Sequence, residues 1–228
     1  MNNQPQLIRG RIFDGVADRG PGSIEIADGL IVQLHYGPDA PAAGSAAVVD
    51  LSDQLITPGL VDVHSHGGGG VAFGLDPAPA LALHRAHGTT TMIASLVSQS
   101  LDELERQLRM LTPLVAAGEL AGVHLEGPWL APGKKGAHPL EMLRAPEPAD
   151  VVRLLDAAAL PDGRGSAVKM VTLAPELDYG IEAVRLLALG ERVLFVDFES
   201  DAASVVGRLV EFGADPDTVR RRFVYVRP

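Results

Sequence analysis

The chain has 228 residues, of which 46% are hydrophobic and 21% charged, and its formal net charge is −10. This acidic balance argues against the basic surface that nucleic acids and anionic membranes require, so we expect neither as a partner. The absence of cysteine excludes disulfides and thiolate metal sites and leaves histidine and carboxylate as the strong metal ligands. No apolar run approaches the roughly 18 residues of a membrane span, and no signal-peptide pattern opens the chain. We therefore expect a cytoplasmic globular protein.

The first part of the chain, 1–54, is predicted to form a small β subdomain. Asp28-Gly29 lies between two apolar runs and predicts a tight hairpin. The segment 37–47 is rich in proline, glycine and alanine, which predicts an exposed connection. The expected strands are 7–13, 23–26 and 30–34.

From about residue 55 the pattern changes to strands that alternate with helices. Such alternation, with nearly continuous apolar strands, predicts a parallel sheet with helices outside it. A closed eightfold barrel needs about 250 residues, so the α/β fold expected here is an incomplete barrel. The expected strands are 56–64, 89–97, 120–125, 167–173 and 193–198, and the expected helices are 77–87, 101–117, 148–159 and 181–189.

His64 and His66 end the first of these strands, just before the glycines 67–70. Because side chains alternate along a strand, both imidazoles project to the same side. Two histidines at the edge of a sheet suit a metal ion. The alternative is a buried strand with two hydrogen-bonded histidines.

Two further stretches carry residues that can take part in a site, one as a metal ligand and one as a binder of an anion. Glu126 ends the strand 120–125 and precedes Gly127-Pro128, so it can reach the sheet edge as a third ligand, or it can cap a helix or pair with a lysine. Lys134 and Lys135 stand in a flexible loop, where they can hold an anion such as a phosphate or lie in solvent.

The remaining histidines and strand-end acids have simpler interpretations. His84 and His87 lie near the end of a helix, where a cation is favoured, and are expected to be structural. His124 alternates onto the side of Glu126 and is either a support behind the ligands or a substitute ligand. Asp62 and Glu176 can orient ligands.

Five motifs in order resemble the N-acetylglucosamine-6-phosphate deacetylase family of the amidohydrolase superfamily. They are 56–67 (ITPGLVDVHSHG), 88–91 (GTTT), 124–128 (HLEGP), 135–138 (KGAH) and 171–176 (VTLAPE).

The resemblance implies hydrolysis of N-acetyl-D-glucosamine 6-phosphate to D-glucosamine 6-phosphate and acetate, in amino-sugar catabolism, by a possible homodimer. It implies one or two divalent ions, zinc or similar. Glu126 matches the family's metal-binding glutamate, and His64 and His66 match the pair that binds a second metal. Gly136, Ala137 and His138 match the loop that contacts the sugar.

The chain departs from the family after 171–176. The family continues with Gly-His-Thr-Asp-Ala and Thr-His-Leu-Phe-Asn-Ala-Met segments that carry metal ligands, and later with a catalytic aspartate. None of these is present, His138 is the last histidine, and no catalytic residue is identified. Two readings follow: a deacetylase, or a truncated or fused, catalytically silent domain that lacks part of the metal site.

The chain is expected to divide into the β subdomain 1–54, a first half of a barrel over 55–190, and a βα segment of different origin over 191–228. That last segment resembles a piece of RecA-type ATPases, with Glu199 in the place of their water-activating glutamate. No phosphate-binding G-x-x-x-x-G-K-[ST] loop occurs in the chain, which argues against nucleotide hydrolysis.

Overall fold

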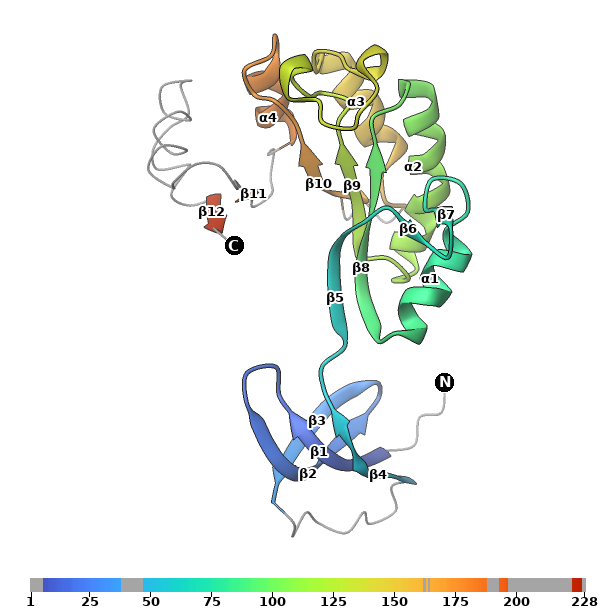
Figure 1. Ribbon diagram of the computed structural model, residues 1–228, viewed down its shortest axis with the longest axis vertical. Helices are drawn as coiled ribbons and strands as arrows, with labels where there is room; N and C mark the ends of the chain where they lie inside the picture. The colour runs from blue at the N-terminus through green and yellow to red at the C-terminus, as the bar shows by residue number, and fades with distance from the viewer. Residues whose placement is uncertain are drawn as a thin grey trace. The chain divides into compact units, whose positions relative to one another are not determined.

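The structure is a computed structural model that describes residues 6–37, 47–161, 163 and 165–187, and the backbone of two later strands. The chain forms two compact units, Met1–Leu60 and Val61–Pro228 (Figure 1).

The first unit holds a four-stranded sheet in the order β3-β2-β1-β4. Its strands are β1 (Gln6–Phe13), β2 (Asp18–Ala27), β3 (Leu30–Tyr36) and β4 (Ala47–Ile56). The predicted hairpin is confirmed, since Ala27 pairs with Leu30 across Asp28 and Gly29, which have φ angles of 52° and 77°. Two central residues with positive φ match the right-handed twist of the strands they join. Most of the predicted connection 37–47 lies outside the described residues.

The predicted strand 56–64 is confirmed from Leu60 onward, but its start is wrong. β4 ends at Ile56, and β5 (Leu60–Ser65) begins after Pro58-Gly59. The proline lacks a backbone N–H and does not favour continuation of the strand, and the two strands belong to different sheets. β4 pairs with β1 in parallel, from Gln6 opposite Ala47 to Ile12 opposite Ile56, and sequence patterns missed it.

The second unit holds a four-stranded sheet in the order β10-β9-β8-β5. β8 pairs in parallel with β9, and β9 with β10. In Figure 1 the helices α1 and α2 lie beside this sheet, and α1 packs on β8 and α2 on β9. The further strands are β6 (Gly67–Gly68), β7 (Val71–Ala72), β8 (Thr89–Val97), β9 (Gly122–Glu126), β10 (Val168–Thr172), and the parallel pair β11 (Val193–Val196) and β12 (Phe223–Val226). The helices are α1 (Pro77–Ala86), α2 (Leu101–Ala116), α3 (Pro148–Ala157) and α4 (Gly180–Leu187), with short 3-10 turns at Pro132–Lys134 and Leu140–Met142.

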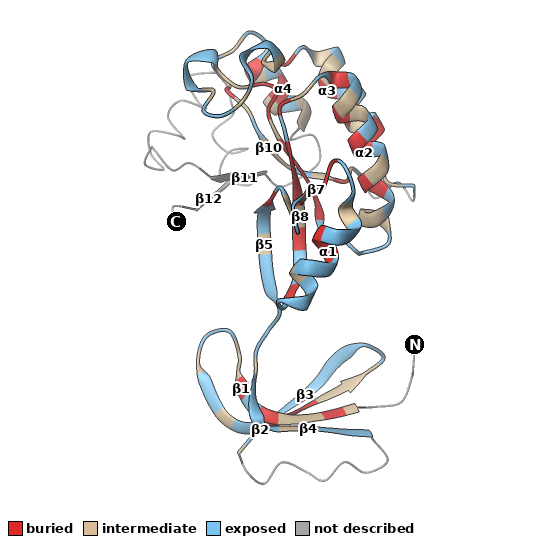
Figure 2. Ribbon diagram, turned by 45° about the vertical axis from the view of Figure 1, so that its right-hand side comes forward, coloured by how far each residue is buried: buried red, intermediate tan, exposed pale blue. Residues whose placement is uncertain are grey.

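The core of this unit lies between the sheet and its helices. Leu104, Leu108 and Leu111 recur at helical spacing along α2, and all three are fully buried. They pack in one cluster with Val123 and Leu125 of β9. Figure 2 shows buried residues on β8 and on the inner faces of the helices. This arrangement confirms an α/β fold with a partial parallel sheet, as expected of an incomplete barrel with a small β subdomain.

β5 differs from its neighbours, because most of its apolar side chains are exposed (Figure 2). Leu60, Val61 and Val63 are 59%, 66% and 54% exposed. The alternative of a buried strand around the two histidines is therefore wrong in this structure. β5 is the last strand of the described sheet, so no described strand lies on its far side.

Within the described part of the chain, no helix combines the length and the apolar character needed to cross a bilayer.

Candidate metal centre

Three of the residues singled out from the sequence converge at the carboxyl edge of the second sheet. His64 lies on β5, His66 follows it, and Glu126 ends β9. The Nε2 atoms of His64 and His66 are 3.1 Å apart. Oε2 of Glu126 is 3.3 Å from Nε2 of His64 and 3.2 Å from Nε2 of His66. Strand alternation thus places both imidazoles on one side, and parallel pairing brings the carboxylate to the same edge.

The spacing and the donor set fit a divalent metal ion. In a tetrahedral site with bonds of about 2.0–2.2 Å, two ligand atoms lie about 3.3–3.6 Å apart, close to the distances among these three atoms. Two imidazoles and one carboxylate suit zinc or a similar ion. The side chains of His64 and His66 are 47% and 48% exposed, and that of Glu126 is 23% exposed. The cluster is therefore partly open to solvent.

Hydrogen bonds outside the cluster hold the ring of His66 and the backbone of His64. Nδ1 of His66 lies 3.1 Å from the carbonyl oxygen of Ser95. Because a carbonyl only accepts, Nδ1 carries the proton and Nε2 keeps its lone pair free for a metal. The backbone N–H of His64 donates to Oδ1 of Asp62 at 3.1 Å. This bond holds the backbone of His64 and not its ring, so an orienting role for Asp62 stays a prediction, and Glu176 is exposed after β10.

His124 lies behind the cluster. Its Nδ1 is 3.0 Å from Oγ of Ser95 and its Nε2 is 2.8 Å from Oγ1 of Thr172, so both nitrogens already have hydroxyl partners. Its ring meets that of His64 edge-on, with centroids 5.0 Å apart. Burial lowers the pKa of His124 to about 4, and the neighbouring His64 acts in the same direction. A neutral ring with both nitrogens occupied favours a supporting role over that of a substitute ligand.

His138 reaches the cluster from the loop after β9. Its Nδ1 is 2.8 Å from Oγ of Ser98, and its Nε2 is 3.8 Å from Oε1 of Glu126, the oxygen that does not face the other histidines. Lys135 donates from Nζ to the carbonyl oxygens of Gly136 and His138 at 3.3 and 3.2 Å. In this conformation Lys135 stabilises its own loop, while Lys134 and Ala137 are exposed.

Sequence reasoning missed three hydroxyl groups that hold the site together: Ser95, Ser98 and Thr172. Ser95 lies opposite His124 in the β8–β9 register, and Thr172 lies opposite Glu126 in the β9–β10 register. Ser98 comes directly after β8 and is 2% exposed. The signal that identified Glu126, a polar residue at the end of a parallel strand, also applies to Ser98 and Thr172.

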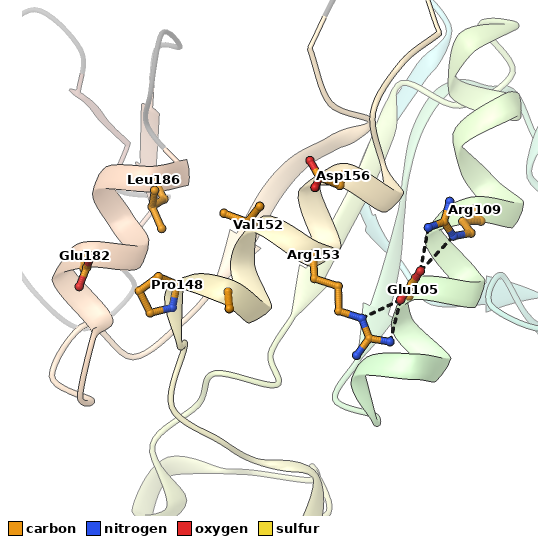
Figure 3. A pocket seen from close by; sticks show the side chains of 9 residues that line it. Glu105, Arg109, Pro148, Val152, Arg153, Asp156, Glu182 and Leu186 are labelled. Atoms are coloured by element: carbon orange, nitrogen blue, oxygen red, sulfur yellow. Dashed lines mark hydrogen bonds and ion pairs between the residues drawn. The ribbon is translucent and has the colours of Figure 1, made fainter.

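A second concave region lies on the helices and lacks such a ligand set. Figure 3 shows Glu105 in this region accepting hydrogen bonds from Arg109 and Arg153. The His64–His66–Glu126 cluster is the only group of metal-binding character in the described residues.

Comparisons with solved structures identify the fold. N-Acetyl-D-glucosamine-6-phosphate deacetylase from Mycobacterium smegmatis is 37% identical, with a TM-score of 0.72, over 92% of this chain and 54% of that one. It was determined as a variant in complex with N-acetyl-D-glucosamine 6-phosphate. The N-acetylglucosamine-6-phosphate deacetylase of Thermotoga maritima is 27% identical, with a TM-score of 0.61, over 78% of this chain and 44% of that one.

Sequence relatives agree. The N-acetylgalactosamine-6-phosphate deacetylase of Escherichia coli O157:H7 is 30% identical over 173 residues, which are 72% of this chain and 42% of that protein. The N-acetylglucosamine-6-phosphate deacetylase of Bos taurus is 37% identical over 153 residues, which are 62% of this chain and 36% of that protein. No protein-family profile matches the chain.

Over its N-terminal part, the chain is therefore homologous to these deacetylases, which are carbon–nitrogen hydrolases. It spans about half or less of the length of these relatives. The comparisons lend no support to the predicted resemblance of the tail, from residue 191, to RecA-type ATPases.

Proposed function

We propose that this chain carries the metal centre of a deacetylase that hydrolyses the N-acetyl group of N-acetyl-D-glucosamine 6-phosphate. The observation that carries the proposal is the cluster of His64, His66 and Glu126, with ligand atoms 3.1–3.3 Å apart. Homology to deacetylases with this substrate in their names supports the reaction class.

In the proposed reaction, water adds to the acetyl carbon, the amide C–N bond breaks, and the products are acetate and D-glucosamine 6-phosphate. When bound, a divalent ion supplies Lewis-acid activation of the water and of the amide carbonyl. His64, His66 and Glu126 would hold the ion, and the sequence resemblance leaves one or two ions as alternatives. Zinc suits this donor set.

The loop of Gly136, Ala137 and His138 is proposed to contact the sugar. The backbone N–H of Ser98 faces Nδ1 of His138 at 3.4 Å, so Nδ1 is the acceptor. In the neutral ring Nε2 then carries the proton and presents a donor beside Glu126. Such a donor suits a sugar hydroxyl or the acetyl carbonyl oxygen. Lys134, exposed in the same loop, is available for the phosphate.

A specific observation favours a second candidate, a catalytically silent domain that binds metal or a partner chain. The 228 residues contain no histidine after His138 and lack the family's segments that carry the further metal ligands and the catalytic aspartate. A general acid or base typically contributes about 10²–10⁴-fold to the rate. A chain that holds the ion without this group would bind metal and turn over slowly or not at all.

The experiment is metal content by mass spectrometry on size-fractionated protein, paired with acetate release from N-acetyl-D-glucosamine 6-phosphate. The proposal expects stoichiometric metal and turnover, both lost in His64→Ala and Glu126→Ala. His87→Ala is the matched control, because His87 is exposed and bonds within its own helix. Metal without turnover would support the silent domain, and absence of both would refute the proposal.

A parallel assay with N-acetyl-D-galactosamine 6-phosphate tests the choice of sugar, since relatives named for each sugar match the chain. A homodimer and a cytoplasmic location stay predictions; light scattering on the same fractions measures the oligomeric state. The ATPase interpretation of the tail has no support and forms no part of the proposal.

A further inference from the structure

We propose that His84 of α1 is a positioning residue for His66, which it holds by clamping the residues on either side of it. The inference rests on the proposed metal centre and adds a residue that the sequence analysis interpreted as purely structural.

The contacts of His84 point to the segment around His66. Nε2 of His84 lies 3.0 Å from the carbonyl oxygen of Gly67 and 3.2 Å from Oγ of Ser65. Ser65 is 8% exposed and donates from its hydroxyl to the same carbonyl at 3.3 Å. Because a carbonyl only accepts, Nε2 of His84 is a donor to Gly67. One imidazole therefore joins the residue before His66 to the residue after it.

The ring of His84 is itself held in place. It stacks on the ring of Phe73, with centroids 6.3 Å apart and an interplanar angle of 17°, and Phe73 is fully buried. The backbone N–H of Phe73 donates to the carbonyl of His66 at 3.0 Å. His66 is thus fixed by its own carbonyl and by both of its neighbours.

The segment after His66 is also closely packed against its surroundings. Gly67 has a φ of 156°, and a Cβ there would lie 2.1 Å from the carbonyl oxygen of Val71. A Cβ on Gly68 would lie 3.2 Å from Nε2 of His84. A side chain at residue 67 would clash with the backbone of Val71, and one at residue 68 would press on His84.

The ring and the backbone of His66 are held by two elements that pack on each other. Its ring is oriented by the carbonyl of Ser95 on β8, and its backbone by α1, which packs on β8. Removing the donor of His84 leaves the ring of His66 anchored on Ser95 and its carbonyl on Phe73, but loosens the residues on either side of it. Groups behind a metal ligand typically contribute about 10–100-fold to metal affinity.

His87 provides a matched control on the same helix. Its Nδ1 is 2.9 Å from the carbonyl oxygen of Leu83, within α1, and its side chain is exposed. Both histidines lie in the last turn of α1 or just beyond it, so an effect through the helix dipole would be shared by the two positions. Only His84 contacts Ser65 and Gly67.

The test compares His84→Leu, His84→Gln and His87→Leu. Glutamine places an amide N–H near the position of Nε2 and should rescue the clamp, whereas leucine removes the donor. Co²⁺ affinity is measured by competition with a chromophoric chelator, and the absorption spectrum of bound Co²⁺ reports the coordination. We expect His84→Leu to weaken Co²⁺ binding by about 10-fold or more, with His84→Gln and His87→Leu within about threefold of the parent.

A second measurement needs no metal. The amide exchange rate of Phe73, whose N–H bonds the carbonyl of His66, is measured by NMR in metal-free protein. We expect His84→Leu to raise this rate about tenfold, with His87→Leu unchanged. If the parent binds no Co²⁺, the metal centre fails and this exchange rate still tests the clamp. Parental Co²⁺ affinity and parental Phe73 exchange in folded His84→Leu would overturn the inference.

Discussion

Gly127→Ala is expected to destabilise the fold through the loop that carries His138. Gly127 has a φ of 81°, and a Cβ there would lie 2.1 Å from Oγ of Ser98. Adopting a left-handed backbone costs a residue with a Cβ about 1–2 kcal/mol. Ser98 must also turn away and lose its hydrogen bond to Nδ1 of His138, which is worth about 1 kcal/mol net. We therefore expect a loss of about 2–3 kcal/mol in the free energy of unfolding.

Gly118→Ala separates the two causes. Gly118 has a φ of 76°, and a Cβ there meets no atom within 4 Å. Gly118→Ala should therefore show the backbone cost alone, about 1–2 kcal/mol. The measurement is urea unfolding followed by circular dichroism, with unchanged m-values as the check that the unfolding transition is comparable. Equal losses in the two variants would refute the argument that Ser98 is displaced.

Three further predictions follow from the packing and charges of the second unit. Hydrogen bonding from Arg106 lowers the pKa of Glu103 to about 2, so this carboxylate stabilises the fold above its unfolded pKa. The difference in Tm between parent and Glu103→Gln should then shrink as the pH falls from about 4 to 2, and a constant difference in a pH series would contradict this. Leu108→Ala should lower the free energy of unfolding by about 3–5 kcal/mol in the same urea assay, because Leu108 is fully buried, against less than about 1 kcal/mol for Leu83→Ala, where the side chain is 40% exposed. Val61→Lys changes a side chain that is 66% exposed on β5 and should reduce self-association in light scattering with little change in Tm; undiminished association would show that β5 is not the contact.

The site could be predicted from the sequence to the extent that strand periodicity and strand ends decide it. Alternation placed His64 and His66 on one side, and parallel pairing explains why Glu126 arrives at the same edge. Periodicity shows on which side of the sheet a side chain lies, but it does not show which residue that side chain contacts. The two roles open for His124 were therefore separated only when its nitrogens were found beside Ser95 and Thr172.

The fold shows the same division. The amphipathic pattern of α2 and the β-branched run of β8 are local, so both elements appear where the sequence predicts them. The break at Pro58-Gly59 separates β4 from β5, and β4 is held by β1, a partner some forty residues earlier in the chain. The contacts of His84 with Ser65 and Gly67 also depend on residues distant in the chain, since they join a helix to the end of a strand. The sequence alone determined the alternation of elements and the three candidate metal ligands, because these follow from local periodicity and from the ends of strands. The tertiary structure decided which strand lies at the edge and which hydroxyls and imidazoles hold the ligands, because these depend on partners distant in the chain.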